Sequence, residues 1–253
     1  MNEKIEQNRL FMQCPLFRAS MKESDQKKGI LPPPHNVCRG GEKIVLPSFE
    51  NLGKSCYMEL LDNRRSVREF TDTPMKAEEL GFLLWSGGGV QKYRDEAGHF
   101  TLRPVPSGGA RHPFELYCAV RNVEGLEPGL YHYLPIENVG EKKVTLEYMG
   151  AIEDYSNTIT EMLADQSWAA KAPAVIMVSC VPYRGEWRYT EASHRVMLID
   201  LGHIGQNLML SAQALGLGSC CIAAYNQQVC DDVLGLDSIN EYTVYGLPVG
   251  SGK

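Results

Sequence analysis

The longest helical pattern in the sequence spans residues 191–215, and Gly216 follows it, as glycine commonly does at the end of a helix. Its centre is apolar except at Asp200, His203 and Asn207, which lie at i, i+3 and i+7 and therefore share one face. An Asp-x-x-His pair can bind a metal, but no third ligand stands at a fixed spacing, so we expect no metal site. We interpret the three residues as a buried polar stripe whose members satisfy one another's hydrogen bonds.

Strand patterns accompany this helix without a regular βαβ alternation. The run 174–181 is continuously apolar between prolines, which is typical of a buried strand. Further strands are expected at 114–120, 130–134, 143–148, 219–223 and 241–249, and further helices at 56–63, 74–85, 152–164 and 229–234. The irregular order favours an α+β fold with helices around one sheet. No G-x-G-x-x-G follows a strand, which argues against a Rossmann domain.

Three local features refine this outline. Thr73 and Pro74 predict the start of one helix, with Thr as N-cap and Pro at the first helical position. Residues 91–104 are polar and predict a mobile loop. Residues 1–50 predict an N-terminal arm whose second half is docked, or alternatively a disordered tail, and residues 51–253 predict one domain.

Composition excludes several classes of protein. The chain has 253 residues and a net charge of -6, which argues against a nucleic-acid binder. The longest apolar stretch, 172–181, is far short of the ~20 residues that span a bilayer. The first residues lack the apolar core of a signal peptide. None of the eight cysteines forms a C-x-x-C pair. We therefore expect a soluble cytoplasmic protein with reduced thiols and no metal, membrane or nucleic-acid partner.

A basic motif stands out against this acidic composition. Arg64, Arg65 and Arg68 fall within five residues, with Ser66 between them. An arginine presents a fork of donors that matches a phosphate or a carboxylate. A solvated basic turn is the alternative, but the clustering of three arginines in a protein of net negative charge favours an anionic ligand.

Two glycine-containing segments are further candidates. Pro106, Ser107, Gly108 and Gly109 precede a strand, and glycine lets a backbone approach a ligand closely. Composition alone equally allows a plain turn at this point. The segment 216–225 is a poor phosphate loop, because no lysine follows at Walker spacing.

Together these motifs resemble the nitroreductase superfamily, and within it the SagB-type branch. The resemblance runs from residue 51 to the C-terminus. It rests on Arg64-Arg65-Ser66-Val67-Arg68, on Pro-Ser-Gly-Gly-Ala-x-His-Pro at 106–113, and on the helical stretch 200–208. The resemblance implies a nitroreductase-like fold, with a central, mostly antiparallel sheet flanked by helices and a long central helix at a dimer interface.

The resemblance also implies a cofactor, FMN. Its phosphate, ribityl chain and pyrimidine edge would be held by Arg64, Arg65, Ser66 and Arg68. The loop Pro106, Ser107, Gly108 and Gly109 would touch the flavin bound mainly by the other subunit. The backbone of Cys221, Ile222, Ala223 and Ala224 would lie against the isoalloxazine ring, with the Ala223 N–H as a donor to N5. Lys253 would be a further candidate for the phosphate.

The pair Arg188-Tyr189 bears on the reaction. SagB-type peptide dehydrogenases, which oxidise azolines to azoles, carry a Lys-Tyr pair around this point. Tyr189 matches and is the candidate catalytic residue, although it could equally be a packed aromatic. Arg188 replaces the lysine, and a permanently protonated arginine is a poor general base.

We therefore expect an FMN-dependent oxidoreductase of the nitroreductase family that acts as a homodimer. NAD(P)H would reduce the flavin, and an electron-poor acceptor such as a nitro compound or a quinone would then reoxidise it in a ping-pong cycle. The alternatives are a SagB-type azoline dehydrogenase of peptide maturation and a flavin-binding protein without turnover.

Overall fold

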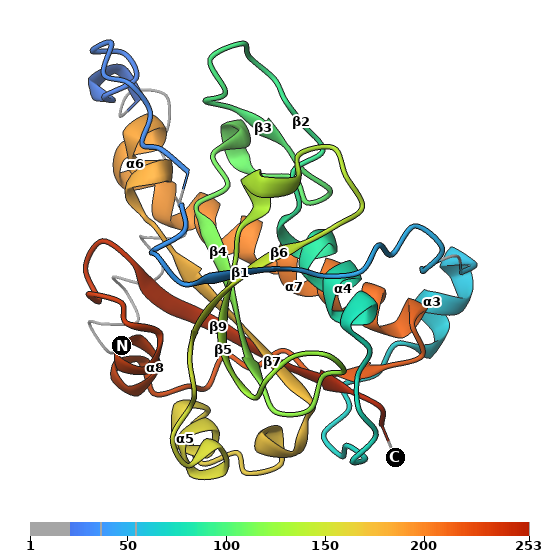
Figure 1. The fold of residues 1–253 in the computed structure, drawn as a ribbon. Coiled ribbons are helices and arrows are strands. Elements are labelled where there is room, and N and C mark those ends of the chain that lie inside the picture. Colours follow the sequence, from blue (N-terminus) through green and yellow to red (C-terminus); the bar gives the residue numbers. More distant parts are fainter. Residues whose placement is uncertain (1–20, 36, 54, 253) are drawn as a thin grey trace, which may run out of the picture.

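The computed structural model describes residues 21–35, 37–53 and 55–252. A seven-stranded antiparallel sheet with the order β1-β6-β5-β4-β7-β9-β8 forms its centre (Figure 1). The strands of this sheet are β1 (Glu42–Val45), β4 (Phe114–Val120), β5 (Gly129–Tyr133), β6 (Thr145–Gly150), β7 (Ala174–Cys180), β8 (Gly218–Ser219) and β9 (Tyr242–Gly250). The helices are α3 (Tyr57–Asn63), α4 (Ala77–Gly88), α5 (Tyr155–Met162), α6 (Tyr183–Tyr189), α7 (Ser193–Ala214) and α8 (Gln227–Leu234).

The central strands separate two hydrophobic cores. Side chains of a strand alternate between its faces, so Leu116 and Cys118 of β4 join one core and Tyr117 and Ala119 join the other. Helices α4 and α7 supply the first core, and α5 and α8 supply the second. All residues of β4 and β7 are buried, which explains the continuously apolar pattern of 174–181.

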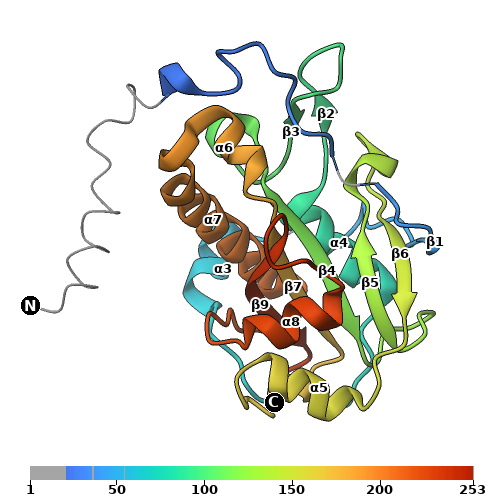
Figure 2. The same cartoon turned by 90° about the vertical axis from the view of Figure 1, so that its left-hand side faces the viewer.

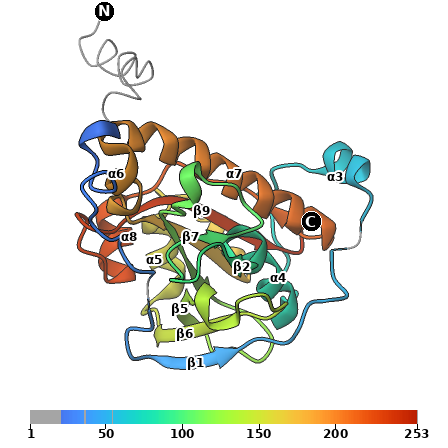
Figure 3. The same ribbon diagram turned by 90° about the horizontal axis from the view of Figure 1, so that it is seen from above.

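The elements with strong periodicity are confirmed, with ends that differ by a few residues. Helix α7 has 22 residues, which makes it roughly 33 Å long, and it runs along one side of the sheet with α3 beside its C-terminal half (Figure 3). Helix α8 ends at Gly235, whose φ of 65° is readily adopted only by glycine. The expected α+β fold with a large antiparallel sheet is present.

The predicted start of α4 is wrong. The helix begins at Ala77 rather than at Pro74. The Met75 N–H donates to the Asn122 carbonyl at 3.1 Å, and the Met75 carbonyl accepts from the Glu124 N–H at 2.8 Å. This pairing holds Met75 in a β-bridge with Val123, so the local preference for a helix start at Thr73 does not prevail.

Two other local predictions need correction. Residues 91–104 contain a paired hairpin, β2 (Lys92–Tyr93) with β3 (Thr101–Leu102), rather than only an irregular loop. The expected strand 219–223 is reduced to Gly218–Ser219 and one isolated bridge between Ile222 and Gly246. Short irregular segments like these depend on partners that are distant in the sequence.

The described part of the N-terminal arm is attached to the rest of the chain at several places. Figure 2 shows it passing over α6 before it reaches β1. The Trp187 indole N–H donates to the Ile30 carbonyl at 2.9 Å, and β1 pairs with β6. Leu46 and Phe49 are buried, so docking of the arm's second half is confirmed. Its separation from the rest as a unit of residues 1–50 stays a prediction.

Within the described residues, no helix combines the length and the apolar character needed to cross a membrane.

Candidate functional site

The basic segment 64–70 is fixed against the end of the sheet. Helix α3 ends as the Arg64 N–H donates to the Leu60 carbonyl at 3.0 Å. Beyond it, the Val67 N–H donates to the Ser219 carbonyl at 3.0 Å. A Cβ on Gly218 would lie 2.7 Å from Val67, so this close approach requires glycine. The segment is therefore held beside β8 by backbone contacts, which leaves its arginine side chains to serve another purpose.

The three arginines lack acidic partners. Arg65 donates through Nη1 to the backbone carbonyls of Asp62 at 3.0 Å and Arg64 at 2.8 Å. The Arg68 guanidinium lies 6.0 Å from the centre of the Trp168 ring. No Asp or Glu in the described part of the chain forms an ion pair with Arg64, Arg65 or Arg68. Three guanidinium groups without a carboxylate fit an anionic ligand such as a phosphate.

The segment 221–224 lies next to this cluster. Ile222 exchanges two backbone hydrogen bonds with Gly246 of β9, at 2.8 and 3.1 Å. Burial raises the pKa of the Cys221 thiol to about 11, and the positive charge of Arg64 opposes that shift. The bridge between Ser66 and Ser219 brings the arginine motif beside this segment. Ala223 and Ala224 are exposed. The Ala223 N–H has no hydrogen-bond partner among the described residues, so it is free to donate to a ligand.

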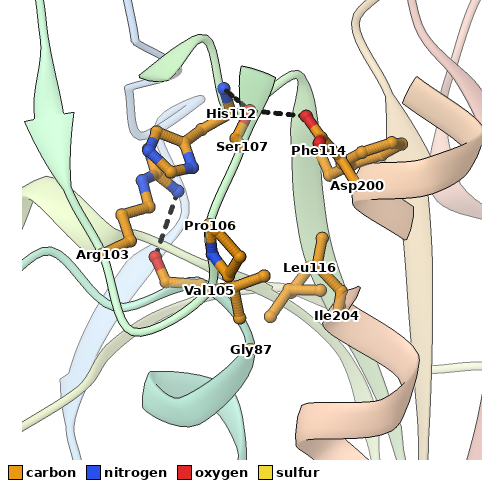
Figure 4. A pocket seen from close by; sticks show the side chains of 11 residues that line it. Gly87, Arg103, Val105, Pro106, Ser107, His112, Phe114, Leu116, Asp200 and Ile204 are labelled. Carbon is orange, nitrogen blue, oxygen red and sulfur yellow. Dashed lines mark hydrogen bonds between the residues drawn. The ribbon is translucent and has the colours of Figure 1, made fainter. Parts of the chain in front are cut away.

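The loop 106–112 is clamped by α7 (Figure 4). Ser107 Oγ donates to Asp200 Oδ2 at 2.6 Å, and the Gly108 N–H donates to the same oxygen at 3.0 Å. The His112 N–H in turn donates to Ser107 Oγ at 2.9 Å. Burial raises the pKa of Asp200, although the hydrogen bonds from Ser107 and Gly108 oppose the shift. This buried carboxylate therefore sets the position of the loop.

The loop backbone is strained. Gly109, Ala110 and His112 have φ angles of 61°, 53° and 46°, and each such non-glycine residue costs about 1–3 kcal/mol. A Cβ on Gly109 would lie 2.5 Å from Tyr189 Oη and 2.6 Å from Arg188 Nε. The loop thus packs directly on the end of α6, and strain of this kind clusters at ligand sites.

The cavity beneath the loop is small. It has a volume of about 20 Å³ and is lined by Arg103, Ser107, His112 and Asp200 among others, as Figure 4 shows. That is space for one water molecule rather than for an organic ligand. Any larger ligand must therefore meet the loop on its outer surface.

The candidate residues form two groups on α7. The segment 221–224 contacts α7 at Gly205, whose carbonyl lies 3.7 Å from Cys221 Sγ, and the arginine motif is joined to Ser219, just before that segment. The loop 106–109 meets Arg188, Tyr189 and Asp200 instead. Lys253 lies outside the described residues.

The predicted polar stripe on α7 is wrong. Asp200 bonds to the loop 106–112, His203 is exposed, and Asn207 donates to the Ser86 carbonyl at 2.5 Å. Each of the three side chains has a different environment, and they form no hydrogen bonds with one another. Helical spacing correctly predicted that the three residues share a face, but it could not predict their hydrogen-bond partners.

A buried ionic network that the sequence motifs did not indicate lies behind the loop. Arg184 Nη1 pairs with Glu115, His132 Nε2 lies 3.3 Å from Glu115 Oε2, and His132 Nδ1 lies 3.5 Å from Glu147 Oε2. All four side chains are almost fully buried. Arg184 also accepts a hydrogen bond from Arg111 Nε through its carbonyl, at 2.9 Å, which connects the network to the loop. Ionisable residues inside otherwise apolar strands were the available signal.

Comparisons with known proteins place most of the chain in one family. Residues 61–251 match the model of the nitroreductase family. The chain is 32% identical over 208 residues to MJ1384 of Methanocaldococcus jannaschii, whose name assigns it to the nitroreductases; the match covers 82% of this chain and 96% of that protein.

Two further matches cover only part of the other protein. The chain is 34% identical over 151 residues to the trifolitoxin-processing protein TfxB of Rhizobium leguminosarum bv. trifolii, which is 57% of this chain and 38% of TfxB. A nitroreductase structure from Anabaena variabilis superimposes with a TM-score of 0.69 at 24% identity; it covers 88% of this chain, and this chain spans 44% of that one. The last likeness concerns the fold. With its arginine motif inside the matched region, the chain belongs to the nitroreductase family.

Proposed function

We propose that the protein is an FMN-dependent oxidoreductase that uses NAD(P)H to reduce a small electron-poor acceptor. The observation that carries this proposal is the position of an arginine motif without carboxylate partners among the described residues: through the bridge of Ser66 to Ser219 it lies beside the segment that carries the free N–H of Ala223. A phosphate and a nitrogen acceptor at the two ends of one ligand match these groups, and FMN carries both.

The residues fit this cofactor in named roles. Arg64, Arg65 and Arg68 would bind the phosphate and ribityl end together with Ser66. The backbone of 221–224, exposed at Ala223 and Ala224, would face the ring, with the Ala223 N–H directed at its N5 edge. Bound FMN supplies the two-electron chemistry; the chain binds it, orients it and excludes water. A protein base is not required, and Tyr189 stays a candidate proton donor.

A homodimer would complete the site. The loop 106–109 and the arginine motif occupy different places on one chain, and the cavity beneath the loop has no space for a flavin. Large apolar side chains are exposed on α3, which lies beside the C-terminal half of α7, and in the N-terminal half of α7 itself. They are Tyr57, Met58 and Leu61 of α3 and Leu198 and Ile199 of α7. A second copy covering this surface would bring its own loop to the flavin of its partner.

Steady-state turnover tests the proposal. The purified protein should oxidise NADH or NADPH when a quinone such as menadione or a nitroaromatic such as nitrofurazone is present. Addition of FMN should increase the rate of any preparation that has lost cofactor. A yellow protein that binds FMN but turns over with neither nucleotide would instead be a flavin carrier or sensor.

Azoline oxidation is the second candidate, because TfxB is a toxin-processing protein. Arg188 and Tyr189 lie against Gly109, the position at which a proton-transfer pair could act. Against this candidate, an arginine is a poor base. We expect the protein to leave a thiazoline-containing peptide unchanged; a loss of two hydrogen masses from the peptide would reverse the ranking.

A further inference from the structure

A second hollow adjoins the loop 106–112 on the side of α6. It has a volume of about 310 Å³ and is lined by Arg94, Asp95, Phe100, Gly109 and Arg188. That volume falls at the lower end of the range for small-molecule sites. Gly109 belongs both to this hollow and to the candidate flavin loop, so a molecule in the hollow would lie beside the proposed redox centre.

Positive charge is concentrated around the hollow. Arg94 is exposed, and its side chain has no hydrogen bond or ion pair within the described residues. Arg188 donates through Nη1 to the neutral amide of Gln26 at 3.0 Å, while its buried Nε has no hydrogen-bond partner. Neither guanidinium is paired with a carboxylate in the described part of the chain.

Arg111 adds a third charge behind the wall of the hollow. Its guanidinium lies between aromatic rings, 4.5 Å from the centre of Trp187 and 5.1 Å from that of Phe100. Burial, together with the charges of Arg188 and Arg184, lowers the pKa of Arg111 to about 10. Positive groups that repel one another in a partly buried place are stabilised by an anion.

One acidic residue lines the hollow, but its oxygens are already engaged. Asp95 Oδ1 accepts from the Phe100 N–H at 2.7 Å, and Oδ2 accepts from the His99 N–H at 3.2 Å. The His99 ring lies 3.6 Å from the same oxygen. Asp95 therefore serves the turn that contains it and leaves Arg94 and Arg188 without a carboxylate partner among the described residues.

From these contacts we infer that the hollow is a subsite for the anionic group of the acceptor, a carboxylate or a phosphate, bound by Arg188 and Arg94. Phe100 supplies an apolar wall for the remainder of the molecule. The assignment of an acceptor to this place rests on the proposed oxidoreductase function, and it narrows the acceptor from any electron-poor compound to an acidic one.

A matched pair of ligands tests the inference. 4-Nitrobenzoate and 4-nitrobenzamide have nearly the same shape and differ in charge. Equilibrium binding by calorimetry should show the wild type binding the benzoate about tenfold more tightly, as expected for one charge-assisted contact that is partly solvated. Arg94→Gln and Arg188→Gln should each remove most of this preference, and Arg188→Lys should keep part of it.

Lys76→Gln is the control, because it removes the same charge from an exposed residue beyond the opposite end of β4. It should leave the preference unchanged. Equal binding of the two ligands by the wild type, or equal losses in the control, would overturn the inference. Because binding is measured without turnover, a protein that fails to reduce either compound but still prefers the benzoate would refute the proposed oxidoreductase and not the anion subsite.

The nucleotide provides a second arm. NADPH carries a phosphate that NADH lacks, and the subsite could receive that group instead. If Arg94→Gln raises KM for NADPH alone and the preference for 4-nitrobenzoate persists, the hollow serves the donor and the assignment to the acceptor is wrong.

Discussion

Arg64, Arg65 and Arg68 carry the proposed cofactor site because their charges have no acidic partner within the described residues. Like charges within five residues repel one another, and nothing in their contacts with backbone carbonyls or with Trp168 removes that repulsion. A bound phosphate would offset this repulsion. Arg64 is the most informative of the three, since it is half-buried and lies near Cys221.

Arg64→Ala should weaken FMN binding by about one to two orders of magnitude. A charge-assisted hydrogen bond contributes about 1.5–3 kcal/mol, and about 1.4 kcal/mol corresponds to a tenfold change in Kd. Fluorescence titration of the apoprotein with FMN measures the loss. The variant should purify paler, regain colour with added FMN and turn over normally when saturated.

Riboflavin is the control for this variant, since it lacks the phosphate. Its affinity should change little if Arg64 binds that group. Equal losses for FMN and riboflavin would show that Arg64 supports the structure of the pocket and that the phosphate is bound elsewhere.

Glu115 predicts a pH dependence of stability. Burial alone would raise its pKa, but Arg184 and His132 outweigh burial and lower the pKa to about 2, from an ordinary value of 4.5. A carboxylate with a lowered pKa stabilises the fold above its ordinary pKa. That contribution should therefore be complete above about pH 4.5 and be lost as the pH falls toward 2.

Glu115→Gln should lower the free energy of unfolding by about 3–5 kcal/mol near neutral pH, because it removes the carboxylate charge that faces the buried Arg184 guanidinium. Urea unfolding at neutral pH and at about pH 3 measures the effect, and the gap between wild type and variant should narrow in acid. Adding Arg184→Met should recover part of the loss. A gap that is constant with pH would contradict this account.

At the scale of elements, α7 acts as the frame that positions both groups of candidate residues. Asp200 on this helix accepts hydrogen bonds from Ser107 and Gly108, and Gly205 lies against Cys221. A Cβ on Gly205 would approach Tyr245 to 2.8 Å, so this glycine serves contact with β9. Gly202 has open space around it and is the one of the two glycines that can admit a partner helix.

Asp200→Ala should release the loop 106–112. The loop keeps its left-handed backbone at Ala110 and His112 only because surrounding contacts hold it, and this substitution removes two of them. We expect kcat/KM to fall about tenfold or more and the free energy of unfolding to fall by about 1–3 kcal/mol. Steady-state kinetics of the FMN-saturated protein measure the effect on turnover, and the melting temperature measures the effect on stability. Unchanged kinetics would show that the loop position is unimportant for turnover.

Some of these elements can be predicted from the sequence and others cannot, because some are stabilised by local properties and others by contacts with distant residues. Helices α7 and α8 and strands β4 and β7 follow from periodicity, apolar content and a terminal glycine, which are local properties. The hairpin of β2 with β3 and the start of α4 depend on pairing with distant backbone, as Met75 does with Asn122 and Glu124. Local preference does not contain that information.

The same limit applies to the whole molecule. The family motif located Arg64, Ser107 and Ala223 as candidates, but it could not show that Asp200 holds the loop from 93 positions away. Nor did it indicate that Arg184 and Glu115, 69 positions apart, form a buried pair behind the site. Such contacts are decided by the packing of the sheet against α6 and α7.

The assembly of two chains is the prediction that belongs to the whole molecule. Leu198 and Ile199 are 56% and 54% exposed on α7, and such adjacent apolar side chains are normally covered. Light scattering with size exclusion at low micromolar concentration should give a dimer. Ile199→Asp should shift the protein toward monomer and lower FMN retention together. A wild-type holoprotein that is a stable monomer would contradict the shared flavin site.

The most direct test of the central claim is the visible absorption spectrum of the purified protein during anaerobic addition of NADPH or NADH. We predict a yellow protein with bound FMN, near one equivalent per chain. The flavin band should bleach with either nucleotide and return when a quinone or nitro acceptor is added. A colourless protein that gains no flavin spectrum from added FMN would contradict the account, as would a bound flavin that neither nucleotide reduces.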